Sequence, residues 1–376
     1  MVFVRRNDLD WMRVIATYMV FLYHCSMFFN PFPWHIKNEM INSSYILVFS
    51  LVVGTWIMPI FFVLSGISTK YAIRKRTGKE FLKERFIQLG VPLIFGIFIL
   101  SPPQVYIERV SHQQFSGTFL SFLPAYFDGL YLEIGGTGNF AFVGLHLWYL
   151  LVLLVFSALT LPLISRIKIK KDSFHLVHYL LILLVLILIT HFFNFVSLGG
   201  WGIPYYLASF VIGFFYFSND SFNKFLTKHW ITISVLAVIM SAIYTKWFII
   251  GMPEQAGGLS FLFTTVKVLS SFNSVLLFFY LANKYFQRKN DFLNFNTMFS
   301  MPMYILHQPV IVLLGFLIYQ YDWPIAIKLL VLISLSFFII ILSYQLFIKR
   351  IPVLRFLFGM KVKPAINTDI HPVMKG

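Results

Sequence analysis

Charged side chains are scarce in this sequence. They make up 12% of its 376 residues, whereas soluble domains carry about 25%. Acidic residues are the scarcest, with 14 Asp and Glu against 30 Lys and Arg. Because 59% of the residues are hydrophobic, so few charges could not cover the apolar surface of a soluble protein. The composition therefore excludes a soluble globular domain and predicts that lipid surrounds most of the chain.

Cysteine is nearly absent. The single Cys25 lies inside the first apolar stretch, so a disulfide framework is excluded. A cleaved signal peptide is not expected, because that stretch is too long and carries Arg13 and His24. The sequence also lacks a fixed-period repeat and a low-complexity tract. We therefore expect residues 1–376 to form a single integral-membrane domain.

Long apolar runs recur along the chain. A helix needs about 20 mostly apolar residues to cross the hydrocarbon of a bilayer. The sequence predicts an all-α, polytopic membrane bundle of about ten transmembrane helices. The predicted spans lie near residues 11–30, 45–66, 87–108, 143–165, 176–197, 201–218, 229–250, 259–281, 299–320 and 324–347. Glycines at 199, 200 and 202 predict a tight turn between the fifth and sixth spans.

The positive charges are distributed unevenly between the two sides of this predicted bundle. A net charge of +16 would suggest nucleic acid as the partner of a soluble protein, but here Lys and Arg gather in the connections on one side. The connections on the other side hold only Lys37 and Arg109. The asymmetry predicts cytoplasmic termini, with the bilayer as a partner and no nucleic acid. The connections predicted inside are 1–10, 67–86, 166–175, 219–228, 282–298 and 348–376.

The first predicted span carries the ionisable residues Asp10, Arg13 and His24. Arg13 and His24 are separated by about three helical turns, a rise of roughly 16 Å, so they share one face. In a structural interpretation, Arg13 pairs with Asp10 near the interface and His24 hydrogen-bonds a neighbouring helix. In a catalytic interpretation, His24 removes a hydroxyl proton as a general base. The spacing alone leaves both open.

A basic cluster follows the second predicted span, which Ser65 and Gly66 are expected to close. The cluster consists of Arg74, Lys75, Arg76, Lys79, Lys83 and Arg85. It could be ordinary cytoplasmic charge that sets topology or contacts anionic lipid. It could equally bind the phosphates of a nucleotide, which guanidinium groups bind well. The density of charge does not separate these functions.

Two further histidines lie in predicted spans. His146 begins HLWYLLVL, together with Trp148, and His307 lies in MYILHQPV. Each could be a packing residue that hydrogen-bonds another helix, or could line the site of an acceptor substrate. No zinc or other metal site is predicted, because no acidic or cysteine ligands accompany the histidines at a usable spacing. The longest outer loop, 109–142, is long enough to help receive a substrate.

In combination, these segments resemble the acyltransferase 3 family of integral-membrane acyltransferases. The matching pieces are LDWMRVIATYMVFLYH, FFVLSG with the following RKR, HLWYLLVL and SMPMYILHQPV, and their order covers nearly the whole chain. The tail YQLFIKRIPVLRFLFG and the HLWYL segment look most like the glucan biosynthesis protein C branch, which is associated with succinylation of periplasmic glucans.

The resemblance implies an enzyme that moves an acyl group from cytoplasmic acyl-CoA to a hydroxyl of an extracytoplasmic glycan. Acyl-CoA would be a co-substrate, with no permanently bound cofactor. The resemblance maps the catalytic centre onto His24 and Arg13, with Asp10 orienting Arg13. It maps the donor site onto Arg74 and Arg76, near Ser65, with Arg85 as a further donor contact.

One position departs from the family pattern. Family members often carry a second Arg four residues before a proline; this chain has Gln88 there and keeps only Arg85.

An acceptor would meet the thioester near His146, Trp148 and His307. Transfer by direct attack or through an acyl-histidine stays open, as does the choice between acetyl and succinyl. The alternative function is a membrane transporter or exporter of a glycan or lipid-linked sugar, because intramembrane Arg and His also mark transport paths.

Overall fold

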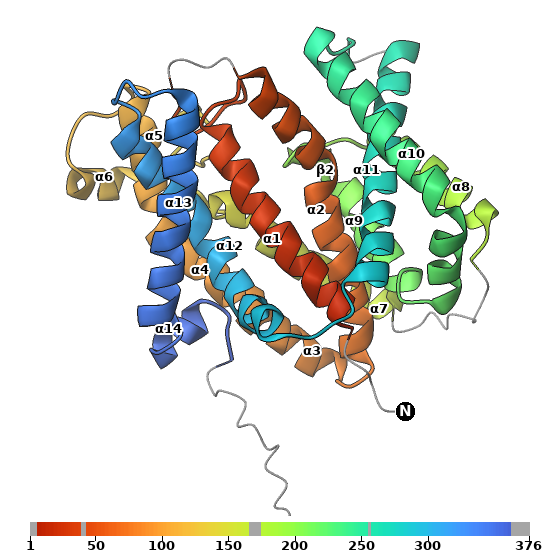
Figure 1. The fold of residues 1–376 in the computed structure, drawn as a ribbon. Coiled ribbons are helices and arrows are strands. Elements are labelled where there is room, and N and C mark those ends of the chain that lie inside the picture. Colours follow the sequence, from red (N-terminus) through yellow and green to blue (C-terminus); the bar gives the residue numbers. More distant parts are fainter. Residues whose placement is uncertain (1–5, 39–42, 165–173, 255–256, 362–376) are drawn as a thin grey trace, which may run out of the picture.

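A computed structural model describes residues 6–38, 43–164, 174–254 and 257–361. Helices account for nearly all of the regular structure in these residues (Figure 1). The helices are α1 Asn7–Met27, α2 Ser44–Ile73, α3 Gly78–Arg85, α4 Val91–Phe95, α5 Ser101–Ser111, α6 Phe119–Ala125, α7 Trp148–Ile164, α8 Leu176–Phe192, α9 Ile203–Phe215, α10 Asp220–Ile250, α11 Gly258–Tyr285, α12 Asp291–Ile318, α13 Ile325–Ser343 and α14 Pro352–Leu357. The predicted all-α class is confirmed for the described chain.

Seven helical stretches in the described residues are long and apolar enough to cross a membrane. They are Ser44–Ile73, Gly78–Ser111, Leu145–Pro162, Asp220–Ile250, Gly258–Tyr285, Asp291–Ile318 and Ile325–Ile348. Two more predicted spans form the shorter apolar helices α8, of 17 residues, and α9, of 13. Helix α1, which forms most of the first predicted span, is not among these seven stretches. A count of ten spans therefore stays a prediction. The predicted connection at 166–175 and the tail from 362 lie largely outside the described residues.

The predicted span near 87–108 is interrupted by two π-helical turns. They are η1 Phe86–Gly90 and η2 Gly96–Leu100, and they join α3, α4 and α5 into one stretch. A π-turn accommodates one extra residue and so rotates the face that the following helix presents. A third π-turn, η4 Tyr344–Ile348, ends α13, while a 3₁₀ turn, η3 Leu145–Leu147, leads into α7.

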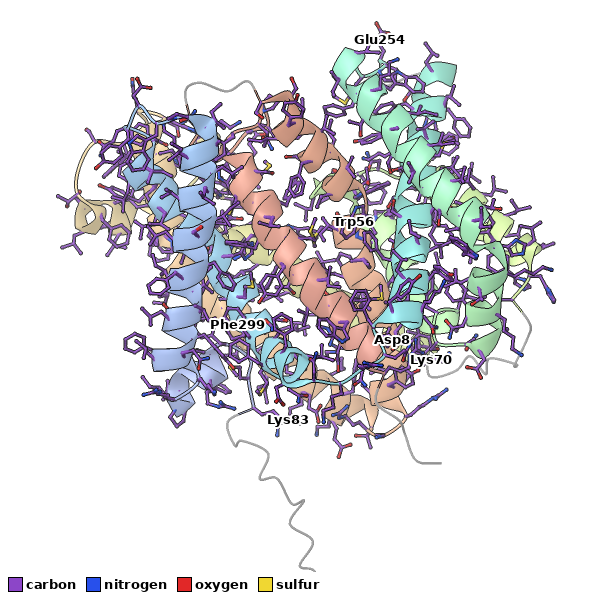
Figure 2. The ribbon with its side chains drawn as sticks, in the orientation of Figure 1. Asp8, Trp56, Lys70, Lys83, Glu254 and Phe299 are labelled. Carbon is purple, nitrogen blue, oxygen red and sulfur yellow. The ribbon has the colours of Figure 1, made fainter. Side chains whose placement is uncertain are left out.

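Helix α1 lies at the centre of the bundle. It packs against α2 on one side and α12 on the other, and it also contacts α11 and α13 (Figure 1). We call the end of the bundle that holds Asp8, Lys70 and Lys83 the lower end, and the end that holds Glu254 the upper end (Figure 2). Helix α1 begins at the lower end and ends at the upper end, so His24 lies above Arg13.

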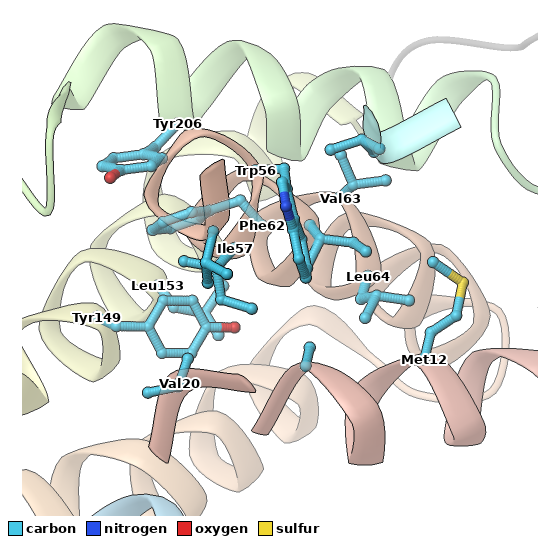
Figure 3. Close-up of a cluster of buried hydrophobic side chains, with 14 of the residues drawn as sticks. Met12, Val20, Trp56, Ile57, Phe62, Val63, Leu64, Tyr149, Leu153 and Tyr206 are labelled. Carbon is cyan, nitrogen blue, oxygen red and sulfur yellow. The ribbon is translucent and has the colours of Figure 1, made fainter. Parts of the chain in front are cut away.

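Helix α2 does not close at Ser65 and Gly66, as the sequence suggested, but continues to Ile73. The reason is packing against α9. A Cβ on Gly66 would lie 2.0 Å from the Phe210 carbonyl oxygen, so the glycine allows the two backbones to approach closely. Apolar side chains of α1, α2, α7 and α9 belong to one buried core, among them Val20, Ile57 and Leu153 (Figure 3).

Two irregular segments cover the upper end. The predicted glycine turn is confirmed: β1 Ser197–Leu198 and β2 Trp201–Gly202 form a short hairpin, and Gly199 and Gly200 have positive φ angles of 55° and 85°. The loop from His112 to Gly144 contains α6 and a small hydrophobic cluster of its own, with Phe122 and Tyr126 at its centre. That this loop helps to receive a substrate stays a prediction.

Candidate functional site

Three histidines from separate elements meet inside the bundle. They are His24 of α1, His146 of η3 and His307 of α12. The ring centroid of His307 is 4.7 Å from that of His24 and 4.9 Å from that of His146. His146 and His307 are buried and His24 is partly exposed. The three histidines that the sequence singled out therefore form one cluster, which we call the histidine cluster.

The hydrogen bonds of the cluster fix which nitrogen carries a proton when the rings are neutral. A carbonyl oxygen only accepts, so a ring nitrogen bonded to it must donate. His307 Nδ1 lies 2.6 Å from the Tyr304 carbonyl, which leaves its Nε2 unprotonated. His24 Nδ1 donates to the Val20 carbonyl at 2.9 Å and to His307 Nε2 at 3.2 Å. The lone pair of His24 therefore lies on Nε2, and none of the described residues hydrogen-bonds this atom.

A proline explains the place of His146. Pro309 has no N–H, so in α12 it leaves the carbonyl of Ile305, four residues earlier, without its helical donor. His146 Nε2 lies 3.1 Å from that carbonyl and supplies the missing donor. The opposite nitrogen of His146, Nδ1, is buried and has no partner among the described residues. His146 therefore presents an unused acceptor next to His307.

A cavity of about 390 Å³ opens below the histidine cluster. This volume is within the range of small-molecule sites. Polar residues that line it include Arg13 and Thr17 of α1, Ser65 and Ser68 of α2, Arg76, Glu84, Arg85 and Gln88 of the following segment, Tyr149 of α7, and Thr297, Ser300 and Tyr304 of α12. The Tyr304 ring closes the upper end of the cavity, with its centroid 5.7 Å from His307 and 5.8 Å from His146. The cavity thus extends from the basic lower end to Tyr304, whose ring separates it from the histidine cluster, and none of the three histidines lines it.

Most hydroxyl protons in the cavity are already committed to protein carbonyls. Those of Thr17, Ser68, Thr297, Ser300 and Tyr304 donate to backbone oxygens. The exception is the pair of Ser65 and Tyr149, whose oxygens are 2.7 Å apart. When Ser65 donates to Tyr149, the Tyr149 hydroxyl donates to the Phe61 carbonyl over a long 3.4 Å. This second bond is the weaker one, so a ligand with a better-placed acceptor can take the Tyr149 proton from it.

The predicted donor-site residues lie in different environments. Arg13 and Arg85 line the cavity, where Arg13 bonds Asp10 at 3.3 Å and Ser68 at 3.1 Å, and Arg85 bonds Thr69 at 3.0 Å. Arg76 lies at the exposed mouth and pairs with Glu84. Arg74 ends α2 with its guanidinium over the Tyr71 ring and does not line the cavity.

Trp148 lies apart from the histidine cluster. Its ring packs against Phe62 and Tyr206, and Gly199 of the hairpin turn lies beside it. The described residues hold no group of three or more His, Cys, Asp or Glu side chains arranged to bind a metal ion.

A buried polar network borders the cluster at the upper end. His35 Nδ1 lies 2.5 Å from Glu108, and Gln308, next to His307, lies 3.0 Å from the other nitrogen of His35. Glu108 also accepts from Tyr131 at 2.7 Å and from Arg109 at 3.2 Å. Burial and the adjoining Glu108 carboxylate raise the pKa of Tyr131, so this phenol remains a donor. The network ties the segment after α1 to α5, α12 and the loop.

Sequence reasoning missed several of these residues. Glu108 lies in a predicted span, and the same argument that singled out His24, that ionisable groups in a membrane are costly, applies to it. Gln308 is next to a histidine that the sequence did single out. Trp34 and His35 carry no such signal, because they reach the cluster only when the chain after Met27 folds back, with Asn38 N bonded to the Phe28 carbonyl at 3.0 Å.

Comparison with known proteins supports an acyltransferase activity. The family model described as "Acyltransferase domain", of the acyltransferase 3 type, matches residues 6–348. Glucans biosynthesis protein C from Escherichia coli strain K12 is 24% identical over 400 residues, covering 98% of each chain, and the same protein from strain O81 is equally similar. No solved structure matches this chain. From the match over residues 6–348, the chain belongs to the acyltransferase 3 family and is an acyltransferase with membrane-spanning helices.

Proposed function

We propose that this protein moves an acetyl or succinyl group from acyl-CoA to a hydroxyl of an extracytoplasmic glycan. The observation that carries the proposal is a cavity lined by arginines that ends at Tyr304, next to a histidine cluster with an unprotonated nitrogen on His24. The similarity to proteins named Glucans biosynthesis protein C supports a glucan as the acceptor.

The donor would enter from the lower end. Its nucleotide phosphates would bind Arg76 at the mouth, because guanidinium groups pair with phosphate in a bidentate way. The cavity is too small for the whole of acyl-CoA but has room for the pantetheine arm and acyl group, which would lie between Arg13, Arg85 and Tyr149. The thioester would then lie near Tyr304, next to the histidine cluster.

The chemistry follows from the protonation of His24. An acceptor hydroxyl gives its proton to His24 Nε2 while its oxygen attacks the thioester carbonyl carbon. The Ser65–Tyr149 pair donates a hydrogen bond to the carbonyl oxygen as negative charge develops on it. The carbon–sulfur bond then breaks, and the proton on His24 passes to the departing thiolate of CoA. His307 holds His24 in the required tautomer by accepting from Nδ1. In the covalent alternative, Nε2 itself attacks the thioester and the acceptor then attacks the acyl-histidine.

The proposed orientation places the lower end in the cytoplasm of a bacterial cell, with both termini on that side of the inner membrane. Lys70 and Lys83 at the lower end support it, since cytoplasmic connections are rich in Lys and Arg. Acyl-CoA is then available where the cavity opens, and the glycan arrives from the upper end, where the loop and the segment after α1 lie.

The test is transfer by the purified protein in detergent, where transport has no meaning. Radiolabelled acetyl-CoA and succinyl-CoA are supplied with unmodified glucan isolated from cells that lack this protein. We expect label in the glucan from one donor, and loss of about 10² to 10⁴ in rate for His24→Asn, which keeps a donor at the Nδ1 position and removes Nε2. Absence of transfer by the wild-type protein, or full activity of His24→Asn, would contradict the proposal and favour a transporter.

A further inference from the structure

One buried donor beside the histidine cluster has no partner. The indole N–H of Trp34 forms no hydrogen bond within the described residues, although Trp34 is only 6% exposed. The Trp34 ring lies against His24, with the two ring centroids 5.4 Å apart. Buried N–H groups almost always have a partner, so an orphan next to a reactive side chain indicates a ligand that is hydrogen-bonded when bound.

Two other tryptophans of the chain hydrogen-bond through their N–H groups. Trp201 donates to the Thr55 carbonyl at 3.1 Å, and Trp11 donates to the Arg288 carbonyl at 3.0 Å. Among the described tryptophans, Trp34 is the one whose N–H is both fully enclosed and without a partner. It lies where the chain folds back over His24.

The unpaired groups around His24 complement a hydroxyl. A hydroxyl has one proton to donate and lone pairs that accept. His24 Nε2 offers the acceptor for that proton, and the Trp34 N–H offers a donor to the oxygen. His146 Nδ1, on a ring whose centroid is 4.9 Å from that of His307, is a second buried and unpartnered acceptor. Two acceptors and one donor suit neighbouring hydroxyls, which are characteristic of a sugar ring.

We propose that Trp34 is a catalytic residue that donates its N–H to the oxygen of the acceptor hydroxyl while His24 Nε2 removes the proton. This inference rests on the proposed function. The O–H bond of the acceptor breaks and its proton goes to His24, the oxygen forms its bond to the acyl carbon, and the carbon–sulfur bond breaks. The Trp34 N–H remains intact throughout and only orients the oxygen toward the thioester.

The surrounding structure holds Trp34 in place before any substrate arrives. Its neighbour His35 is held by Glu108 and Gln308, and the ring of His35 lies with its centroid 5.1 Å from that of Trp34. A donor that is fixed in advance needs no rearrangement during the reaction, which is what makes such groups effective.

Replacement of Trp34 by Phe removes the N–H and keeps an aromatic ring. With unmodified glucan as the probe acceptor, we expect Trp34→Phe to lower transfer about tenfold, mainly through a higher KM for glucan, as for the loss of one hydrogen bond. CoA binding should be unchanged, and the melting temperature should be equal or higher because a buried unpaired donor is gone. The matched control is Trp56→Phe, a buried tryptophan that packs on Phe278 of α11. It should transfer at the wild-type rate.

A second substitution separates the loss of the N–H from the smaller size of Phe. Incorporation of 3-benzothienylalanine at position 34 keeps the shape of the ring and replaces the N–H by sulfur, and it should match Trp34→Phe. Transfer by both variants within twofold of the wild-type rate, or an equal loss in Trp56→Phe, would overturn the inference. If the wild-type protein itself transfers nothing, the proposed function fails, and the two failures are thereby distinguished.

Discussion

His307 Nε2 accepts a hydrogen bond from His24 Nδ1, 3.2 Å away, because the Nδ1 proton of His307 is already bonded to the Tyr304 carbonyl. The bond joins α12 to α1 and, together with the bond to the Val20 carbonyl, sets the tautomer of the histidine to which the family resemblance assigns the chemistry. We therefore expect His307 to act on the reaction through His24, as a positioning residue.

Two substitutions of His307 separate its acceptor from its donor. Asn keeps a donor for the Tyr304 carbonyl but has no acceptor at the Nε2 position, whereas the Gln side chain can place its oxygen there. We expect His307→Gln to retain about tenfold more transfer activity than His307→Asn, measured as kcat with labelled donor. The pH–rate profile should shift in His307→Asn, because protonated His24 then has one acceptor fewer at Nδ1, where only the Val20 carbonyl remains. Equal activities and unchanged profiles would show that His307 only fills space.

The arginines should contribute unequally to donor binding. Arg85 and Arg13 line the cavity, while Arg74 lies over Tyr71 outside it. A hydrogen bond to a charged group contributes roughly 1.5 to 3 kcal/mol, so Arg85→Ala should weaken CoA binding by about 10- to 100-fold. Arg76 is partly exposed and paired with Glu84, so screening by water should make its loss smaller. Titration calorimetry with CoA measures each affinity, and Arg74→Ala is the matched control. A larger loss in Arg74→Ala than in Arg85→Ala would refute this placement of the donor.

The Ser65–Tyr149 pair should act in the chemical step. Tyr149→Phe removes the phenol hydroxyl. The shorter Ser65 side chain does not extend to the position of that hydroxyl, so kcat should fall about 10²-fold, as for the loss of an oxyanion donor. Ser65→Ala leaves the Tyr149 hydroxyl able to turn to the substrate, so its loss should be smaller. Single-turnover kinetics with saturating acyl-CoA give both rates. The order of the two effects is the critical outcome, since a simple packing role would not make Tyr149→Phe the more severe change.

The buried network at the upper end should contribute strongly to stability. Glu108 is fully enclosed and accepts from four groups, including His35 and Arg109. Removal of one partner of a buried charge pair costs about 3 to 5 kcal/mol, because the other charge is left uncompensated. We therefore expect Glu108→Gln to lower the thermal stability of the detergent-solubilised protein substantially. Glu133→Gln, which changes an exposed residue of the loop from His112 to Gly144, should not change the thermal stability measurably. Equal stabilities would mean that the network does not hold the loop.

The sequence predicted the all-α class, the glycine hairpin and the three histidines, because each depends on a local pattern. The length of an apolar run predicts a membrane helix, and an ionisable residue inside such a run is a candidate functional residue. The prediction that α2 ends at Ser65 and Gly66 was wrong. In a sequence, a glycine that ends a helix looks the same as one that allows a neighbouring helix to approach, and only the position of Phe210 beside Gly66 distinguishes them.

Other features of the site could not be predicted for the same reason. The π-turns at Phe86–Gly90 and Gly96–Leu100 rotate the faces of the third span without any change in its hydropathy. The role of Pro309 depends on His146, which is far away in the chain, and the approach of Trp34 to His24 depends on the fold of the segment after α1. These are tertiary relationships between residues that carry no shared signal in the sequence.

Cys25, next to His24 in α1, is the one thiol of the chain and is completely enclosed. A maleimide reagent that cannot cross membranes would thus find no native target in the intact protein. A cysteine introduced at Leu120 of the loop, or at Lys79 near the lower end, would be the single site of labelling, without prior removal of Cys25. The sidedness of each end of the bundle can therefore be measured on intact cells in an otherwise native chain.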